Sequence, residues 1–198
     1  MRSLFVTFTF CMTSLLNYLR NFGPLSKSAE DAVRLVARRI EVKKNADLQP
    51  IGHTCKTIYF LESGIARIYY YKADVEVTES FSFENCLVVR YESLFTGRPS
   101  RKAIQMLEDA ELIAIDANAL FRLYDQHHDV ERIFRRIFEA ALVDQVNRIE
   151  SIQFHTAEER YHAFMKERRD ALLRVPLKYI ASYLGITPVS LSRIRAQR

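Results

Sequence analysis

The sequence predicts an α+β protein built from three successive parts. Strand-like segments rich in β-branched and aromatic residues recur roughly every ten residues between Glu41 and Ile115. A long helical pattern then runs from Asp129 to Phe154, and the stretch from Leu177 to Arg195 has the pattern of two short helices joined by a tight turn. We therefore expect a small antiparallel barrel or sandwich, a long helix and a helix-turn-helix, in that order.

The composition is that of a folded globular protein with a basic end. Hydrophobic residues make up 48% and charged residues 27% of the 198, which excludes a disordered chain, and 5 Gly and 5 Pro exclude collagen-like sequences. The net charge of +5 lies entirely in residues 171–198, which contain five basic residues and no acidic one. This distribution favours an acidic partner for the last part of the chain.

The N-terminal residues 1–24 are predicted to form an extension and a helix that ends at Gly23-Pro24. The apolar run from Leu4 to Leu16 resembles a secretory segment, but threonines interrupt it and no cleavage motif follows. It is also too short to span a bilayer, so we expect no membrane contact. A short strand, a frayed arm or an upstream extension of a protein that begins at Met12 fits residues 1–11 better.

The cysteines and histidines do not indicate a metal site, a cofactor or an enzyme. Cys11, Cys55 and Cys86 have no spacing suited to a disulfide framework, which favours a reducing cytoplasm. His155, Glu159 and His162 could share one helix face, but a helix start and a solvated face explain them more simply. A metal-dependent enzyme on a barrel would need more ligands than the fragment His53-Thr-Cys55 provides.

Residues 25–127 are predicted to hold a short helix and the barrel. Ser28 and Asp31 form a capping-box pattern before a helix that runs to Ile40. Residues 57–61, 65–71, 75–83 and 110–115 are the clearest strands, and turn residues such as Ser63-Gly64 separate them. Asp116 is expected to cap the helix that follows.

Residues 128–155 are predicted to form a dimerisation helix. Apolar residues recur along it at steps that average the 3.5 residues of a coiled-coil seam, at Phe138, Leu142, Val146, Ile149 and Ile152. Val130, Phe134 and Ile137 can pack on the barrel of the same chain, but a stripe that continues beyond a small domain has nothing left to cover. We therefore expect the helix to pair with its copy in a homodimer.

Residues 156–198 are predicted to form a helix-turn-helix domain. Thr156 and Glu159 form a capping box that opens a helix through Leu172. Ala181 is the small residue that two steeply crossed helices need at their contact, and Gly185 tolerates the positive φ of the turn. Thr187 and Pro188 are the expected N-cap and first residue of the second helix.

The second helix leaves short side chains mixed with arginines on its open face. A purely structural hairpin needs no basic surface, whereas a helix in the DNA major groove needs small residues, arginines and no acid. The predicted contacts to double-stranded DNA with a palindromic operator are Lys178, Thr187, Pro188, Val189, Ser190, Ser192, Arg193 and Arg195.

The order of these parts resembles the Crp/Fnr transcription regulators. Val175 to Arg195 looks like their DNA-binding motif, while Phe60 to Tyr70 and Ser93 to Ser100 look like their β-roll. The resemblance covers residues 12–198. It implies a jelly-roll-like, cyclic-nucleotide-binding-like sensor domain and a winged helix-turn-helix, although the chain stops soon after the second helix and has little room for a wing.

Two departures from the family pattern concern the effector. The Gly-Glu pair that holds the ribose in cyclic-nucleotide-binding members is absent, and Ser100-Arg101 stands in reversed order to their Arg-Ser. Cyclic AMP binding is therefore not expected, and Cys11 and Cys55 do not supply the iron-sulfur cluster of other members. The expected function is a cytoplasmic, homodimeric transcription regulator with an unidentified effector. The alternative is a dimeric ligand-binding or interaction protein whose hairpin does not read DNA.

Overall fold

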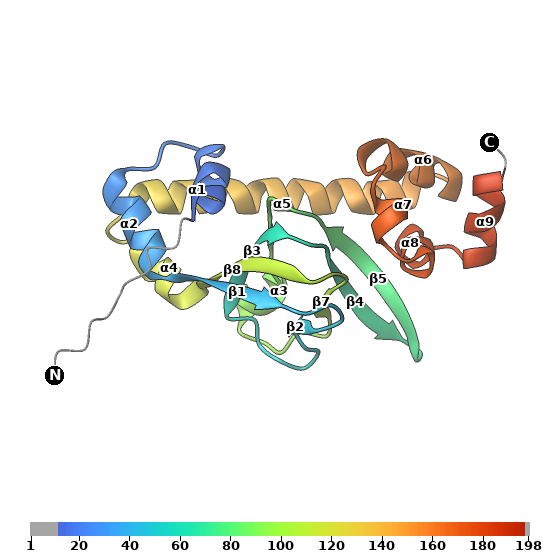
Figure 1. The fold of residues 1–198 in the computed structure, drawn as a ribbon, viewed down its shortest axis with the longest axis horizontal. Helices are drawn as coiled ribbons and strands as arrows, with labels where there is room; N and C mark the ends of the chain where they lie inside the picture. The colour runs from blue at the N-terminus through green and yellow to red at the C-terminus, as the bar shows by residue number, and fades with distance from the viewer. Residues whose placement is uncertain (1–11, 197–198) are drawn as a thin grey trace.

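The structure, a computed structural model, describes residues 12–196; the segment predicted as a strand or arm and Cys11 lie outside this range. The first helix, α1 (Thr13–Arg20), confirms the helix predicted from Met12 onward. It buries Leu15, Leu16 and Leu19 in the main core and lies beside the long helix described below (Figure 1). Helix α2 (Lys27–Leu35) follows.

The predicted boundaries of the second helix were wrong at both ends. Ser26, not Ser28, is the N-cap, because its Oγ accepts a hydrogen bond from the backbone N–H of Ala29 at 3.3 Å. The helix ends at Leu35, and Ile40 lies opposite Leu112 in a strand pair. Apolar residues continue across this junction, so their spacing alone does not show where strand pairing replaces the helix.

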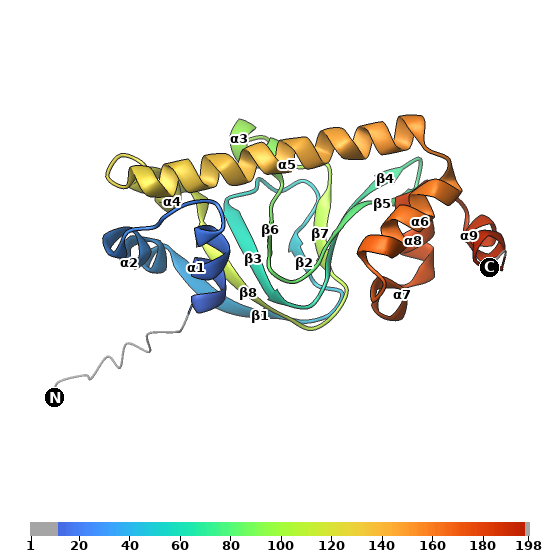
Figure 2. The same cartoon turned by 90° about the horizontal axis from the view of Figure 1, so that it is seen from above.

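In the described part of the chain the strands form two four-stranded antiparallel sheets that pack as a roll (Figures 1 and 2). The order in the first sheet is β1 (Ala37–Val42), β8 (Ala110–Asp116), β3 (Thr57–Ser63), β6 (Cys86–Val88). The order in the second is β2 (Asp47–Gln49), β7 (Ala103–Met106), β4 (Ala66–Lys72), β5 (Val75–Ser82). A short helix, α3 (Tyr91–Thr96), lies between β6 and β7.

The strands predicted from sequence, β3, β4, β5 and β8, are confirmed to within a residue or two at each end. The missed strands are short or charged. Strand β1 is an edge strand and contains the exposed residues Arg38, Arg39 and Glu41, whereas β2 and β6 have three residues each and β7 has four. Their pairing with longer strands holds them in the sheet, and no local pattern reveals that.

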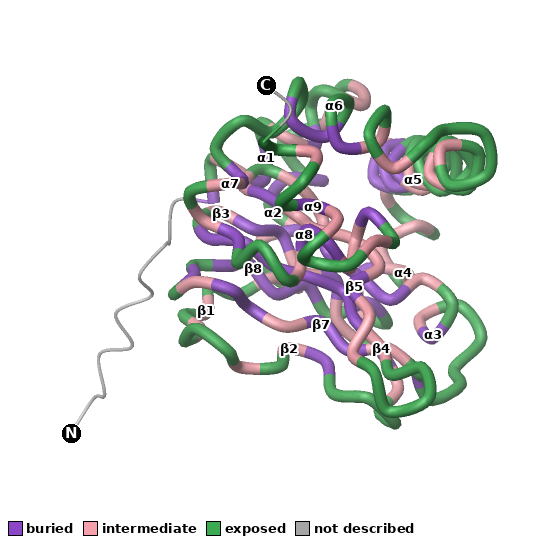
Figure 3. The backbone as a smooth tube through the Cα atoms, turned by 90° about the vertical axis from the view of Figure 1, so that its right-hand side faces the viewer, coloured by how far each residue is buried: buried purple, intermediate pink, exposed green. Residues whose placement is uncertain are grey.

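Helix α4 (Ala117–Leu123) begins as predicted, with the Asp116 carboxylate accepting from the N–H of Ala119 at 2.6 Å. The long helix, α5 (His128–Phe154), runs past the roll toward the C-terminal domain (Figure 2). Its first part buries Val130, Phe134 and Ile137 against the roll, as expected. Its far part is mostly exposed, as Figure 3 shows by the change from purple to green along the helix.

The C-terminal helices contain the predicted helix-turn-helix. They are α6 (Ala157–Glu167), α7 (Ala171–Arg174), α8 (Leu177–Leu184) and α9 (Pro188–Ala196). The capping box of Thr156 and Glu159 is present, but α6 ends at Glu167 and Leu172 belongs to α7. Gly185 has φ of 71°, and Thr187 Oγ1 accepts from the N–H of Ser190 at 3.1 Å. Helix α9 is the last element of the described range and ends at Ala196.

Gly64 holds the tight connection between β3 and β4. It has φ of +97°, and a Cβ at this position would lie 2.8 Å from the Cβ of Ala110 and 3.1 Å from the carbonyl oxygen of Asp109. We predict that Gly64→Ala lowers the free energy of unfolding by at least about 2 kcal/mol, because backbone strain and a clash add together.

Gly97→Ala is the matched control for this prediction. Gly97 also has a positive φ, of 68°, but nothing lies within 4 Å of an added Cβ. The expected loss is about 1 kcal/mol, from backbone strain alone. Urea unfolding followed by circular dichroism gives the free energy of unfolding of both variants. Equal losses would show that the clash with Ala110 adds nothing to the cost of the backbone strain.

Candidate DNA-binding surface

The predicted DNA contacts lie on α8, on α9 and in the turn between them. Leu191 is buried and fixes α9 against α8, which leaves the opposite face of α9 in solvent. Ser190 is half-buried, with its Oγ 3.0 Å from Thr187 Oγ1. The other predicted contacts are exposed: Lys178, Thr187, Pro188, Val189, Ser192, Arg193 and Arg195.

The positive charge on this face is not neutralised by the protein. Lys178, Arg193 and Arg195 make no ion pair within the described residues, so their charges are available to phosphate. Arg174, which the charge count placed in the same basic segment, is different because three carboxylates surround it. The free basic surface is therefore smaller than the composition indicated, and it is concentrated on α8 and α9.

The first helix of the motif packs directly on the roll. Ser182 of α8 accepts a hydrogen bond at its Oγ from the N–H of Thr78 in β5, at 2.9 Å. The ring of Phe81 lies 5.3 Å from that of Tyr183 and 6.1 Å from that of Phe164. Three residues of the roll, Ile65, Phe83 and Leu107, belong to the same buried cluster as the core of the helical domain. The sensor-like roll and the helix-turn-helix therefore share a core.

A buried cation anchors this contact. Arg67 of β4 is only 1% exposed and donates to Gln105 at 2.6 and 2.9 Å and to Glu76 at 2.8 Å. Its guanidinium carbon also lies 3.7 Å from the ring centroid of Tyr179 on α8. A cation desolvated against an aromatic face is attracted to the ring, so α8 is held at Tyr179 by a group that belongs to the roll.

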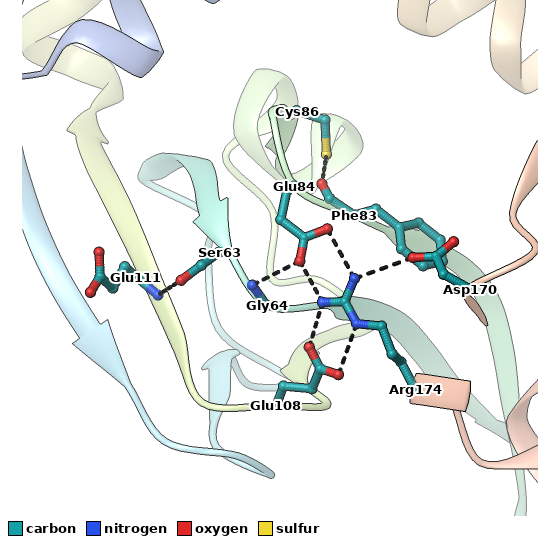
Figure 4. A network of polar contacts seen from close by, with 9 residues as sticks. All are labelled: Ser63, Gly64, Phe83, Glu84, Cys86, Glu108, Glu111, Asp170 and Arg174. Atoms are coloured by element: carbon teal, nitrogen blue, oxygen red, sulfur yellow. Dashed lines mark hydrogen bonds and ion pairs between the residues drawn. The ribbon is translucent and has the colours of Figure 1, made fainter. Parts of the chain in front are cut away.

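A second ionic contact closes the junction at Arg174 (Figure 4). Its guanidinium donates to Glu108 at 2.6 and 3.1 Å and also pairs with Glu84, while Asp170 lies at 3.3 Å. Glu84 in turn accepts from the backbone N–H of Gly64 at 3.2 Å. Hydrogen bonding from Arg174 holds the pKa of Glu84 below its ordinary value, and the two glutamates raise the pKa of Arg174.

Sequence reasoning missed this junction, because no local signal marks it. Glu108 and Glu84 are 66 and 90 residues from Arg174 in the chain, and Tyr179 and Arg67 are also far apart. A glutamate in a loop and an arginine at a helix end are ordinary surface residues in sequence. One hint was present: a basic segment with no acid of its own can find partners elsewhere in the chain.

The predicted seam residues of α5 fall into two groups. Leu142, Val146, Ile149 and Ile152 are 66, 45, 55 and 54% exposed, so the chain itself does not cover them. Phe138 is half-buried, with its ring 5.2 Å from Phe95 and 5.9 Å from Tyr91 of α3. Phe138 thus marks the point where packing within the chain ends and the bare apolar stripe begins.

The roll carries a small, partly exposed ionic cluster. Glu79, the unpaired residue of a bulge between β4 and β5, bonds Lys102 at 2.5 Å and Arg90 at 3.4 Å. Arg101 is exposed, and Ser100 Oγ donates to the carbonyl of Lys102 at 2.7 Å. Arg90 and Lys102 thus each pair with the same carboxylate of the chain.

The fold and the exposed basic helix define a two-part protein in which a β-roll carries a helix-turn-helix on a long helix. Residues 39–127 match the family model of the cyclic nucleotide-binding domain. No curated protein sequence matches the chain. No helix among residues 12–196 is both long enough and apolar enough to cross a membrane.

Solved structures of bacterial regulators share the architecture. FixK2 from Bradyrhizobium japonicum is similar over 82% of this chain and 84% of its own, with a TM-score of 0.72 and 21% identity. A regulator from Eubacterium rectale assigned to the crp/fnr family is similar over 88% of this chain and 85% of its own, with a TM-score of 0.68 and 19% identity. The catabolite activator protein of Thermus thermophilus is similar over 91% of this chain and 85% of its own, with a TM-score of 0.57 and 18% identity.

Residues 39–127 are therefore similar to the cyclic nucleotide-binding domain, and the chain has the fold of the Crp/Fnr transcription regulators. This confirms the family resemblance and the predicted α+β architecture.

Arg174 is predicted to stabilise the docking of the helical domain on the roll. Replacing it by Met keeps the apolar stem and removes the hydrogen bonds to Glu84 and Glu108, which should lower the free energy of unfolding by about 1–2 kcal/mol at pH 7. The pKa of Glu84 is lowered in the folded protein, so its stabilising pair is complete above the ordinary value of 4.5 and is lost as the pH falls through the folded value.

Urea unfolding at several pH values tests this account. The difference between wild type and Arg174→Met should shrink steadily below pH 4.5. Arg169→Met is the control, since Arg169 is exposed and makes no ion pair within the described residues. A difference that stays constant down to pH 3 would show that the pairing with Glu84 does not stabilise the fold.

Proposed function

We propose that the protein is a homodimeric, sequence-specific DNA-binding transcription regulator. The observation that carries the proposal is the open face of α9, where short side chains and two arginines without ion pairs stand on a helix fixed by a capped turn. Such a helix fits the major groove, where an arginine can donate two hydrogen bonds to a guanine edge. The shared fold with Crp/Fnr regulators supports the same function.

The bare stripe of α5 supports the proposed dimer. Leu142, Val146 and Ile149 lie on one side of the helix, and burying them against a second copy removes apolar surface from water. A two-fold axis along this helix pair makes the two recognition helices symmetric. Their target is then an inverted repeat with half-site centres about 10 base pairs apart, the spacing found for dimeric helix-turn-helix proteins.

The roll is proposed to act as the sensor for a small effector that is not cyclic AMP. Glu79 already pairs with Arg90 and Lys102, and Arg101 is exposed. The docking of α8 on β5 provides a direct route from the roll to the DNA-reading helix. A cytoplasmic, non-enzymatic protein fits this function.

Arg193 is predicted to read a base, whereas Lys178 contacts phosphate. Arg193 lies one turn beyond Val189 on the exposed face, within reach of a guanine edge if the N-terminal part of α9 enters the groove. Arg193→Ala should cost about 1–3 kcal/mol on the cognate site and relax the preference at one position per half-site. Lys178→Ala should weaken all duplexes similarly and reduce the salt dependence.

Binding titrations on cognate and scrambled duplexes at several salt concentrations separate these two roles. An equal loss on both duplexes for Arg193→Ala would make Arg193 a phosphate contact. If the wild-type protein binds neither duplex at low salt, the alternative holds, and the hairpin serves a ligand-binding or interaction protein that does not read DNA.

The exposed stripe on α5 is predicted to be the dimer seam. Leu142→Asp combined with Val146→Asp would bury two unpaired charges in the seam, a penalty of several kcal/mol, and should give monomers in sedimentation velocity. Ala140→Asp is the control, because Ala140 is exposed on another side of the same helix. A dimer that persists in the double variant would refute the seam.

A further inference from the structure

Two tyrosines on α8 connect the helical domain, which comprises α6 to α9, to the rest of the protein. Tyr179 and Tyr183 are four residues apart, so they lie on the same side of the helix, one turn from each other. The guanidinium carbon of Arg67 in β4 lies 3.7 Å from the ring centroid of Tyr179. That of Arg148 in α5 lies 3.9 Å from the ring centroid of Tyr183. Each ring thus contacts an arginine from a different part of the molecule.

The arginine under Tyr179 is held in place by the roll. Arg67 donates through Nε and Nη2 to Gln105 of β7, at 2.9 and 2.6 Å. Its Nη1 donates to Glu76 at 2.8 Å and to Thr78 at 3.3 Å, both on β5. All of these partners belong to the roll, so they fix the plane of the guanidinium whether or not α8 is present. The ring on α8 therefore rests on a cation whose position is already set.

The covalent connection between α5 and the helical domain does not fix the direction of that domain. His155, the C-cap of α5, has φ of −106° and ψ of 146°, and Thr156, the N-cap of α6, has φ of −67° and ψ of 163°. Figure 2 shows α6 turning away from α5 at this point. Rotation about the backbone bonds of two such terminal residues would swing the domain and leave both helices intact.

The direction of α8 is set instead by the contacts along its length. Tyr179 rests on the roll, Tyr183 rests on α5, and Ser182 between them accepts from the N–H of Thr78 in β5 at 2.9 Å. A helix held at one point can pivot about it, whereas a helix held at two points on two different elements resists pivoting. Leu191 is buried and packs α9 against α8, so the direction of α8 is also that of α9.

We propose that Tyr179 and Tyr183 are positioning residues for DNA recognition, which fix the direction of α9 in each protomer and thereby the half-site spacing that the dimer accepts. Neither ring has to touch DNA in this role. Two recognition helices held in fixed positions engage both half-sites only when the spacing matches, and the affinity gained from binding both is lost when it does not. The proposal rests on the proposed function, because spacing matters only to a dimer that reads an inverted repeat.

A neighbouring lysine determines which quantity the test has to measure. The Nζ of Lys178, a predicted phosphate contact, lies 4.7 Å from the ring centroid of Tyr179. Replacing Tyr179 therefore also changes the surroundings of this ammonium group. Phosphate contacts carry no sequence information, so such a change weakens all duplexes alike. A ratio of affinities between duplexes that differ only in half-site spacing removes this effect.

The test uses the full-length protein and the inverted repeat that selection of genomic fragments recovers. One duplex keeps the selected spacing, a second has two base pairs inserted between the half-sites, a third has a single half-site and a fourth is scrambled. The insertion turns one half-site about the DNA axis by about 70°, since a helical turn takes about 10 base pairs. We expect it to weaken wild-type binding about tenfold or more, because the two half-sites can no longer be engaged together.

The variant Tyr179→Leu removes the ring and keeps an apolar side chain. The insertion should weaken its binding only about twofold, because a helical domain that can swing reaches both half-sites at either spacing. It should still prefer the single half-site to the scrambled duplex, since α9 is unchanged. Tyr179→Phe is the matched control, because it keeps the ring that contacts Arg67, and it should show the spacing dependence of the wild type.

A second variant decides the matter if Tyr179→Leu is unfolded, which thermal melts followed by circular dichroism reveal. Ser182→Ala removes the acceptor of the Thr78 N–H and keeps a good helix former, so it should also reduce the effect of the insertion. Wild-type spacing dependence in a folded Tyr179→Leu, or in Ser182→Ala where that variant has to replace it, would overturn the proposal.

The wild-type protein separates this inference from the proposed function. Equal affinity for both spacings, with the single half-site preferred to the scrambled duplex, would overturn the positioning role and leave a DNA-reading regulator. Equal affinity for all four duplexes would instead refute the proposed function.

Discussion

The structure depends on a single constraint, the placement of helix α5. Its first part is fixed because Val130, Ile133, Phe134 and Ile137 complete the core beneath the roll. The remaining part continues for several turns beyond that core as a rigid arm. Everything at the C-terminal end of the chain is positioned by this arm and by what it meets on the roll.

The arm has two unlike sides, and each has a different consequence. One side presents Leu142, Val146 and Ile149 to solvent, an apolar stripe that a second copy would cover. The other presents Arg148 to the aromatic wall formed by β5, α6 and α8. The proposed dimer seam and the contact with Tyr183 of α8 thus lie on separate sides of the same helix.

The helix-turn-helix domain is not an independent unit on a linker. Residues Ile65, Phe83 and Leu107 of the roll complete its buried cluster, and Arg67 stacks on Tyr179. Since a cation as buried as Arg67 is stable only with its partners in place, the contact between α8 and the roll has a defined geometry. A change in the roll near β5 would be transmitted to α8 without passing through the long helix.

Sequence reasoning predicted the elements whose signals are local. The capping box at Thr156, the turn at Gly185 and the cap at Thr187 each depend on a few neighbouring residues, and all three are present. Strand β1 was mistaken for helix at Ile40, because its place is set by pairing with β8, more than seventy residues later in the chain. The pairs of Arg174 with Glu84 and of Arg67 with Tyr179 were missed for the same reason, since each joins ordinary residues that only the fold brings together.

The central claim is that an α5-paired dimer reads a symmetric DNA site with α9. The most direct measurement is selection of bound genomic fragments by the purified protein, followed by sequencing. The account predicts recovery of an inverted repeat with half-site centres about 10 base pairs apart. Fragments without a common motif, or with a single unpaired half-site, would contradict it.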